Sequence, residues 1–312
     1  MMTYQPFYIE AFKKGLLSKK AAQARKMLES CTLCPRRCRV DRTAGELGLC
    51  RTGEKAHLAF YKSHYGEETP LVGKNGSGAF FFTYCNLLCI FCQNFELSHE
   101  GCGREVSDSE LADIMMILQD GGCPNIHFIT PTHVLSPILS ALEIAVQKGL
   151  CIPLVYNSSG YESFEVLKLL DGLIDIYMPD FKFWDSEVAR RLCNAPDYPE
   201  IARQAVKEMH RQVGDLKIEE DGIARRGLLL RHLLLPAGMA GTREVMRFVA
   251  QEISPDTYVN IMPQFRPYGR SREIRELMQP IRKPDYVNAL EAAREEGIFR
   301  IDRRPGRVFM GF

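Results

Sequence analysis

The sequence lacks a large charge of one sign, a long apolar run and an internal repeat, and each absence narrows the possible functions. Its 40 Lys and Arg residues nearly balance its 39 Asp and Glu residues, which leaves a formal net charge of +1. This balance predicts no broad electrostatic surface for nucleic acid or anionic lipid. No stretch approaches the roughly 18 apolar residues that span a bilayer, so we expect no membrane partner.

The sequence also begins without the pattern of a secretory signal. The first residues, MMTYQPFYIE, contain no basic segment followed by an apolar run, so we expect no signal peptide. Eleven cysteines are nevertheless present among 312 residues. Without a secretory signal, clustered cysteines indicate metal binding or catalysis rather than disulfides. We therefore expect a reducing compartment, with the cytoplasm as the default localisation.

Six short apolar runs, rich in β-branched or aromatic residues, predict buried strands. They lie at 79–84, 126–130, 152–156, 173–178, 228–235 and 258–262. Helical patterns separate them, at 107–120, 136–148, 161–170, 185–213 and 242–252. This alternation predicts an α/β fold with a parallel sheet. Because six units are too few for a closed eight-stranded barrel, we expect a partial (β/α)6 TIM-like barrel of parallel strands.

Further segments flank or interrupt this core. Residues 8–29 have the composition and spacing of a helix, and a Pro- and Gly-containing loop with four cysteines follows. Residues 214–227 are predicted as an inserted hairpin, and one more helix is expected from 284. We predict three parts: a helix and four-cysteine segment (1–75), the barrel core (76–270) and a helical C-terminal extension (271–312).

Three cysteines follow the first predicted strand directly. Cys85, Cys89 and Cys92 have the spacing C-x3-C-x2-C, at the end of a strand where α/β barrels build their sites. Three thiolates on a four-iron cluster leave one iron open for another ligand. Two alternatives remain: a zinc site, or three buried cysteines on one helix face, since the spacing i, i+4, i+7 also fits a helix.

The segment CNLLCIFC, with the aromatic Phe91 before its third cysteine, resembles the cluster motif of the radical S-adenosylmethionine (SAM) superfamily. The longer stretch FFFTYCNLLCIFCQN is similar to the pyruvate formate-lyase activating enzymes and their uncharacterised relatives, and the resemblance covers roughly 76–265. It implies a 4Fe–4S cluster whose open iron binds SAM. It also implies reductive cleavage of SAM to a 5′-deoxyadenosyl radical that abstracts hydrogen, with reduced flavodoxin or ferredoxin as electron donor.

The resemblance implies further that SAM lies against the carboxyl ends of the later strands. The predicted SAM contacts are Phe91, Thr130, Thr132, His133, Asn157, Ser158, Asp180, Lys182, Arg231 and Gln264. No residue is predicted to be catalytic itself, because the cofactor makes the radical. Thr130-Pro131-Thr132-His133 departs from the Gly-Gly-Glu that relatives usually carry.

Each of these polar residues also has an ordinary structural interpretation. His133 fits the start of a helix, and Asn157 and Ser158 fit helix caps. Asp180 and Lys182 match an Asp-x-Lys of the activating enzymes, but such a pair is also common on solvated loops. Arg231 lies inside an apolar run, where it faces either an anionic ligand or a structural ion pair.

A second group of cysteines lies in the N-terminal loop. Cys31, Cys34, Cys38 and Cys50 have the spacing C-x2-C-x3-C-x11-C. Four thiolates can close around a zinc ion or a second iron–sulfur cluster; four free cysteines are the alternative. The arginines of this loop are expected to be solvated, and the remaining cysteines to be small buried residues. These two sets are Arg36, Arg37, Arg39 and Arg42, and Cys102, Cys123, Cys151 and Cys193.

The function expected from these observations is that of a radical SAM enzyme acting on a protein or peptide. Activation of a glycyl-radical enzyme is the nearest named activity. The first alternative is radical modification of a small molecule or of another macromolecule. The second is a non-catalytic protein in which two zinc sites support an interaction surface.

Overall fold

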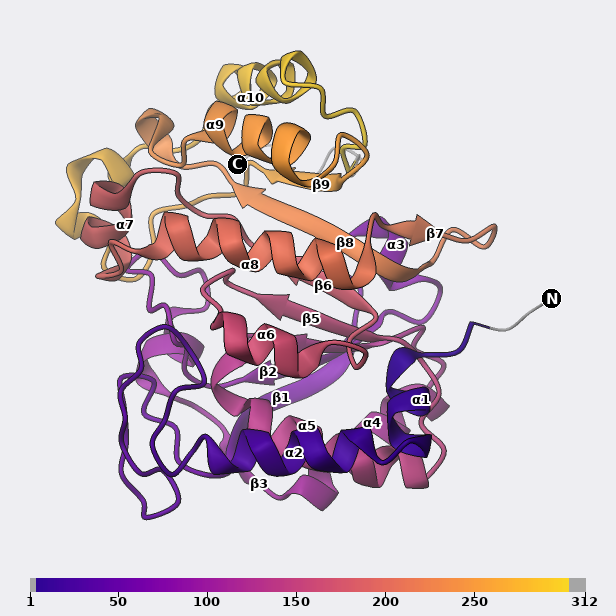
Figure 1. The fold of residues 1–312 in the computed structure, drawn as a ribbon. Coiled ribbons are helices and arrows are strands. Elements are labelled where there is room, and N and C mark those ends of the chain that lie inside the picture. Colours follow the sequence, from indigo (N-terminus) through magenta and orange to yellow (C-terminus); the bar gives the residue numbers. More distant parts are fainter. Residues whose placement is uncertain (1–3, 303–312) are drawn as a thin grey trace.

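A parallel β-sheet forms the centre of the computed structural model, which describes residues 4–302 (Figure 1). Among these residues, nine strands lie in the order β3-β1-β2-β4-β5-β6-β8-β7, with β9 paired to β8. The strands that run parallel to one another are β2 (Ser77–Phe82), β4 (Ile126–Ile129), β5 (Leu154–Ser158), β6 (Ile176–Pro179), β8 (Ala224–Leu233) and β9 (Tyr258–Met262). The predicted α/β fold with six parallel strands is confirmed, and the sheet remains an open, partial barrel.

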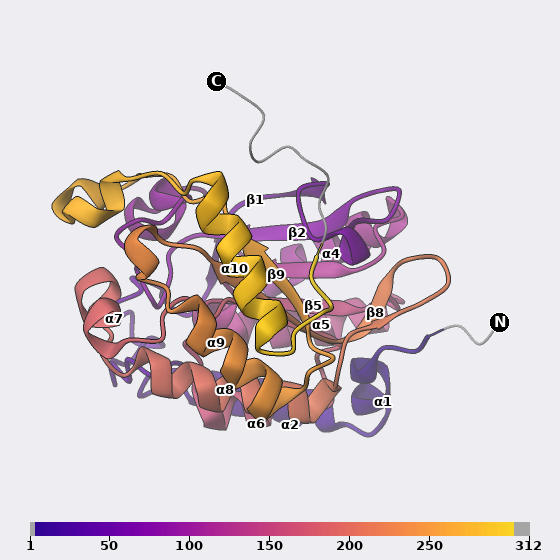
Figure 2. The ribbon, with the colours of Figure 1, turned by 90° about the horizontal axis from the view of Figure 1, so that it is seen from above.

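Helices cover the outer face of this sheet (Figures 1 and 2). The helices that connect successive parallel strands are α4 (Asp108–Asp120), α5 (Leu135–Gln147), α6 (Phe164–Leu170), α7 (Ser186–Cys193), α8 (Tyr198–Val213) and α9 (Thr242–Phe248). The C-terminal helix α10 (Lys283–Glu295), expected from the sequence, packs against α9. These crossovers make the parallel sheet buried on its outer side, which explains its apolar strands.

The two faces of the sheet bury different groups of side chains. On β8, Leu228 and Leu230 belong to the large core beneath the helices. Leu229 belongs instead to a smaller apolar group inside the barrel, together with Val155 and Met178. Because successive side chains of a strand point to opposite faces, Arg231 points inward like Leu229.

Two predicted helices are each divided in the structure. The helix expected over 8–29 is α1 (Phe7–Lys13) followed by α2 (Leu16–Lys26), because Gly15 between them has a left-handed φ of 65°. The helix expected over 185–213 is divided into α7 and α8 at Asn194, whose φ is 49°. Apolar periodicity continues across both breaks, so it does not reveal them.

Two antiparallel strands were not expected from the sequence. β1 (Ala56–His64) pairs with β2, and β3 (Arg104–Val106) pairs with β1. The short helix α3 (Thr69–Val72) joins β1 to β2. The predicted hairpin is present, with β7 (Lys217–Ile218) antiparallel to β8. The division into three parts, at 1–75, 76–270 and 271–312, stays a prediction. Strand β1, from the first part, lies in the same sheet as the strands of the second part.

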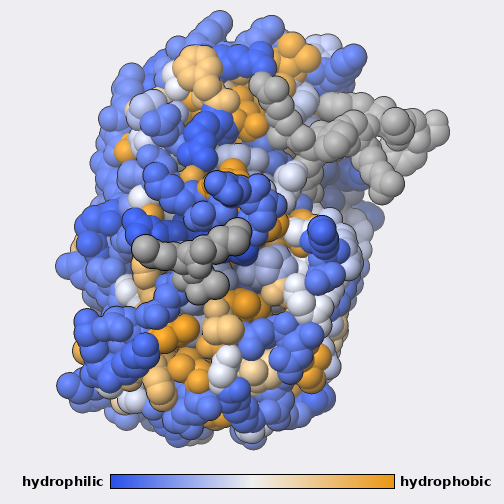
Figure 3. All heavy atoms as spheres, turned by 90° about the vertical axis from the view of Figure 1, so that its right-hand side faces the viewer, coloured by the Kyte–Doolittle hydropathy of each residue, from blue (hydrophilic) through white to orange (hydrophobic). Residues whose placement is uncertain are grey.

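The strands β5, β6 and β8 point toward the left of Figure 1, so their carboxyl ends lie there, and their amino ends lie on the right. Figure 3 shows that right-hand face, where hydrophobic residues gather only in small groups among hydrophilic ones. The N-terminal segment reaches this side of the sheet and is fixed there by Asp175. One oxygen of that carboxyl group accepts hydrogen bonds from the Tyr4 hydroxyl (2.7 Å) and the Phe7 amide (2.9 Å). The other accepts from the Leu154 amide (2.8 Å).

Asp175 predicts a specific pH dependence of stability. Burial raises the pKa of this carboxyl group from 3.8 to about 7. Between about pH 4 and pH 7 the folded protein therefore keeps a proton that the unfolded chain has lost, and the unfolding free energy falls as the pH rises through this range. We compare the unfolding free energy of Asp175→Asn with that of wild type at pH ~5 and pH ~8. The difference, variant minus wild type, is expected to be about 3 kcal/mol larger at pH ~8 than at pH ~5.

Anaerobic urea unfolding of both proteins at the two pH values measures this change. Any unfolding free energy that the Asn side chain itself costs is the same at both pH values, so it cancels when the two differences are compared. The exposed Asp113→Asn on α4 is the control and is expected to show no such trend. An equal difference between Asp175→Asn and wild type at both pH values contradicts the interpretation.

Candidate functional site

A cavity of about 300 Å³ lies at the carboxyl ends of the parallel strands. Cys85, Cys89 and Cys92, on the loop that follows β2, line it together. The remaining walls come from the ends of β4, β5, β6, β8 and β9, which the parallel topology brings to one edge of the sheet. These walls include Thr130, Asn157, Ser158, Asp180, Lys182, Arg231 and Gln264.

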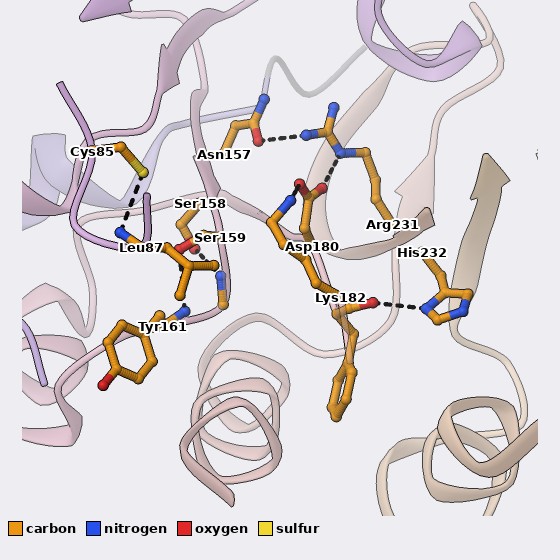
Figure 4. Close-up of polar contacts among 12 residues, drawn as sticks. Cys85, Leu87, Asn157, Ser158, Ser159, Tyr161, Asp180, Lys182, Arg231 and His232 are labelled. Atoms are coloured by element: carbon orange, nitrogen blue, oxygen red, sulfur yellow. Dashed lines mark hydrogen bonds and ion pairs between the residues drawn. The ribbon is translucent and has the colours of Figure 1, made fainter. Parts of the chain in front are cut away.

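The loop that carries these three cysteines is not a helix. Tyr84 and Leu88 have left-handed φ values of 70° and 56°. The Leu87 amide donates a hydrogen bond to the Cys85 sulfur at 3.4 Å (Figure 4). The alternative of three buried cysteines on one helix face is therefore wrong. Three thiols on an irregular loop at a cavity wall fit a cluster with three protein ligands.

An ion-pair group faces the cysteines across the cavity. The Asp180 carboxylate accepts from Lys182 Nζ at 2.6 Å and from Arg231 Nε at 2.7 Å (Figure 4). Arg231 Nη2 donates to Asn157 Oδ1 at 2.9 Å. The inward direction of Arg231 places it at this site, as the alternation along β8 predicts. We call Asp180, Lys182 and Arg231 the charged triad.

Asp180 is ionised although it is buried. Burial raises the pKa of its carboxyl group, but Arg231 and Lys182 together hold that pKa below its ordinary value. For Lys182, burial lowers the pKa of the ammonium group, and Asp180 and Cys89 outweigh that effect and raise it. All three groups of the charged triad are therefore charged at neutral pH. Arg231 Nη1 also lies 3.8 Å from a carboxyl oxygen of Glu67 and 3.9 Å from one of Glu68, so Lys182 is the cation of the triad that remains for an anionic ligand.

A glycine allows the chain ends of β5 and β6 to meet at this site. Gly160 has a φ of 74°, and a Cβ atom there would lie 2.6 Å from the Asp180 carbonyl oxygen. Its amide donates to the Ser158 hydroxyl at 3.2 Å. Any larger residue would push apart the two loops that carry the polar wall of the cavity.

Most of the predicted SAM contacts lie together, but two do not. Phe91 lines the cavity and packs edge-on against Phe183 and Phe265, with ring centroids 6.0 Å apart in both pairs. Thr132 and His133 are absent from the cavity wall. They belong to a 3-10 turn, Thr132–Val134, that leads the chain away from the end of β4.

The side chains of that turn have other partners. The Thr132 hydroxyl donates to Glu162 at 2.6 Å, and His133 Nε2 lies 2.8 Å from the carbonyl oxygen of Thr83. Burial lowers the pKa of His133 to about 4, so its ring is neutral. Thr132 and His133 were expected to touch SAM, but neither lines the cavity. The turn after Pro131 directs their side chains toward Glu162 and Thr83 instead.

Two neighbours of the cysteine loop were not expected from the sequence. Cys193, at the end of α7, lies beside Cys89, and a hydrogen bond from it is the largest cause that lowers the pKa of Cys89. The Ile90 amide donates to the Leu192 carbonyl at 3.0 Å and holds the loop against α7. No spacing signal reveals this contact, because about a hundred residues separate Cys193 from Cys92.

The prediction of solvated arginines is wrong for two of the four. Arg42 is buried, with 2% of its surface exposed. Arg36 is half-buried and donates to backbone carbonyls, whereas Arg37 and Arg39 are exposed as expected. The four cysteines of the N-terminal group line a second, much smaller pocket beside Arg36 and Arg42; they are Cys31, Cys34, Cys38 and Cys50. Within residues 4–302, no three Cys, His, Asp or Glu side chains are grouped as ligands of a single metal ion.

Comparison with known proteins agrees with the geometry of the cavity. The family model of the radical SAM superfamily matches residues 80–223. The chain belongs to the radical SAM superfamily. This radical SAM protein is 30% identical over 295 residues to an uncharacterized protein of Methanocaldococcus jannaschii, covering 91% of this chain and 80% of that protein.

Solved structures are also similar to this chain, at low sequence identity. A radical SAM methyltransferase from Sphaerobacter thermophilus shares 15% identity at a TM-score of 0.48, covering 74% of this chain and 67% of that chain. A domain of a pyruvate-formate lyase-activating enzyme from Bacteroides vulgatus shares 13% identity at a TM-score of 0.36, covering 61% of this chain and 89% of that chain.

Membership in the superfamily makes this protein an enzyme that uses a 4Fe–4S cluster and SAM. The alternative of a non-catalytic zinc protein is therefore not retained. Across residues 4–302, no helix combines the length and the apolar character needed to cross a membrane.

The cluster ligands can be tested one at a time. Alanine at Cys85, Cys89 or Cys92 removes one of only three protein ligands, so we expect each variant to lose the iron of this cluster and its visible absorption. Iron and sulfide assays on anaerobically purified protein measure the loss. Cys151→Ala, at an exposed position, is the control and is expected to keep wild-type iron. Full iron in Cys89→Ala would show that the ligand set is different.

Proposed function

We propose that this enzyme binds SAM between the three-cysteine loop and the charged triad and directs the radical at a protein or peptide. When bound, the cluster supplies the electron that cleaves SAM to methionine and a 5′-deoxyadenosyl radical, which abstracts a hydrogen atom from the substrate. The observation that carries the proposal is the cavity itself. It joins Cys85, Cys89 and Cys92 to the Lys182 ammonium group and to a wall of uncharged polar groups.

The residues of the cavity have distinct roles in holding SAM. The Lys182 ammonium group has three donors, and Asp180 takes one of them, so the others are available for the methionine carboxylate. Asp180 fixes the direction of Lys182 and of Arg231. Asn157 and Ser158, at the end of β5, offer short polar side chains to the ribose hydroxyls or the carboxylate. Phe91 and Gln264 complete the pocket on the side of the cysteine loop and of β9.

The volume of the cavity favours a macromolecular substrate over a small molecule. About 300 Å³ is at the lower end of ordinary ligand cavities, and in this proposal the cluster and SAM together occupy it. The atom that loses hydrogen must then enter from the rim, as a side chain or backbone on an exposed partner segment does. The similarity of the cysteine segment to activating enzymes supports the same conclusion and makes a glycyl-radical enzyme the first partner to consider.

The reaction also needs an electron donor and a reducing compartment. We include reduced flavodoxin or ferredoxin as the donor, since members of this superfamily use such proteins. All eleven cysteines are free thiols in the structure, which supports a cytoplasmic location for the reaction.

The direct test is reductive cleavage of SAM. We expect anaerobically reconstituted enzyme, given dithionite and SAM, to release 5′-deoxyadenosine and methionine. Cys85→Ala, Cys89→Ala and Cys92→Ala are expected to release neither. When a protein that co-purifies with the enzyme is deuterated and added, deuterium is expected in the 5′-deoxyadenosine, as measured by mass spectrometry. A fully loaded enzyme that releases no 5′-deoxyadenosine refutes the proposal.

Transfer of deuterium from a small molecule, with none from any co-purifying protein, would identify the small-molecule alternative. The volume argument would then be wrong, because the cavity would hold both SAM and that substrate.

The role assigned to Lys182 predicts weaker binding of SAM in Lys182→Met. Charge-assisted hydrogen bonds contribute about 1.5–3 kcal/mol, so we expect the Kd for SAM to rise roughly 10- to 100-fold. The iron content is expected to stay that of wild type, which separates a lost SAM contact from a lost cluster. Calorimetry under argon measures the affinity. The matched control is Lys168→Met on the exposed face of α6, and equal affinities for the two variants contradict the role of Lys182.

A further inference from the structure

The four cysteines of the N-terminal loop converge although they span twenty residues of irregular chain. Cys31, Cys34 and Cys50 are buried, with 7%, 8% and 8% of their surfaces exposed, and Cys38 is half-buried. All four line one small pocket. The Arg39 amide donates to the Cys31 carbonyl and the Cys31 amide donates to the Val40 carbonyl, which folds this part of the loop back on itself.

Two of these four sulfurs have a hydrogen-bond donor directed at them, as a metal-bound thiolate can accept. The Leu49 amide points at the Cys38 sulfur at 3.4 Å, and Arg42 Nη1 lies 3.8 Å from the Cys31 sulfur. A Cβ atom at Gly48 would lie 3.0 Å from the Cys38 sulfur. The chain therefore approaches the Cys38 sulfur closely, and a donor is directed at two of the four sulfurs.

Arg42 carries a buried positive charge that needs an anion. Its guanidinium group donates to the carbonyls of Gly53 (2.9 Å) and His133 (2.8 Å) and to the Cys31 sulfur. In the part of the chain that the structure describes, none of its hydrogen bonds goes to a carboxylate. An unbalanced buried charge is strongly destabilising. Four thiolates around a divalent metal, or around an iron–sulfur cluster, supply negative charge at this place.

We propose that Cys31, Cys34, Cys38 and Cys50 bind a second metal centre with four thiolate ligands and no open position. Arg42 balances its negative charge. Because the protein supplies all four ligands, this centre does not bind SAM or substrate; it orders the loop around it.

Arg36 connects this second centre to the loop of the first cluster. It lies between Cys34 and Cys38, and its side chain reaches across to the other loop. Nε donates to the Asn86 carbonyl (3.1 Å), and Nη2 donates to the carbonyls of Leu87 (3.2 Å) and Cys193 (2.7 Å). Asn86 and Leu87 stand between Cys85 and Cys89, so Arg36 is a positioning residue for the first cluster.

The planar guanidinium group suits this role. It lies over the Tyr161 ring, 5.2 Å from its centroid, and the Asn86 side chain donates to the Tyr161 carbonyl at 2.8 Å. All three acceptors of Arg36 named above are backbone carbonyls, so the link fixes the backbone path of the three-cysteine loop. A lysine has a single charged nitrogen and does not reproduce this fork of donors.

The metal of the second centre is either iron in a cluster or zinc, since both accept four sulfurs. As the four side chains stand, they are not grouped around a single ion. A single zinc ion requires sulfurs about 2.3 Å from the metal, so the thiols must rotate inward to bind it. An iron–sulfur cluster is larger and spans sulfurs that lie farther apart.

The second centre can be tested without the first. In the full chain carrying Cys85→Ala, Cys89→Ala and Cys92→Ala, we expect a thiolate-bound metal to remain after anaerobic reconstitution. Elemental analysis and Mössbauer spectroscopy identify it as iron with sulfide or as zinc. Adding Cys31→Ala and Cys34→Ala to this background is expected to remove it.

The matched control adds Cys102→Ala and Cys151→Ala, both at exposed positions, to the same background and is expected to keep the metal. Equal metal contents with and without Cys31 and Cys34 overturn the proposal. Because the three ligands of the first cluster are already absent, this result is independent of the proposed radical chemistry.

The role of Arg36 needs a spectroscopic measurement. We expect Arg36→Ala to retain the second metal but to change the electron paramagnetic resonance spectrum of the reduced first cluster, with partial loss of its iron. Arg36→Lys is expected to show the same change, because it lacks the fork of donors. The exposed neighbour Arg37→Ala is the control and is expected to match wild type. If both Arg36 variants have the spectrum and the iron content of wild type, the positioning role is refuted. If Arg36→Ala does not fold, Arg36→Lys alone provides the test.

Discussion

The parallel direction of six strands is the constraint on which the rest of the structure depends. It brings the ends of strands far apart in the sequence to one edge of the sheet, so the cysteine loop after β2 lies opposite Asp180 after β6 and Arg231 on β8. No single segment contains the site. The small apolar group around Leu229 fills the interior of the sheet, and the cavity lies at the carboxyl ends of its strands.

Buried charges are the main cost of this arrangement, and each is compensated locally. Asp180 is stable as an ion because two cations contact it, and Arg231 is stable inside an apolar strand because Asp180 and Asn157 accept its hydrogen bonds. Removing one member leaves the others as unpaired buried charges, which is costly. The same reasoning applied to Arg42, whose partners are carbonyls and a sulfur, leads to a second anionic centre rather than to a carboxylate.

The strands and most of the cavity wall could be predicted from the sequence for physical reasons. Parallel strands buried on both faces appear as apolar runs, and the polar residues that follow them lie at one edge of the sheet. β1 was missed because it is an antiparallel strand whose second half is exposed or half-buried, so it does not form a continuous buried apolar run. The placement of His133 was missed because a short turn after Pro131 decides the direction of its side chain, and periodicity does not reveal such a turn.

The contacts that Cys193 and Arg36 make with the three-cysteine loop could not be predicted from the sequence. They form only when segments far apart in the chain pack together. Together they suggest why the N-terminal segment accompanies the barrel. A loop with two left-handed residues, Tyr84 and Leu88, has little secondary structure to hold it, yet three of its sulfurs must keep a fixed spacing. Hydrogen bonds from Arg36 to its backbone, and from Ile90 to the end of α7, supply that rigidity from outside. The four-thiolate centre that we propose would in turn hold Arg36 in place, and through Arg36 the N-terminal cysteines would support the backbone of the three-cysteine loop.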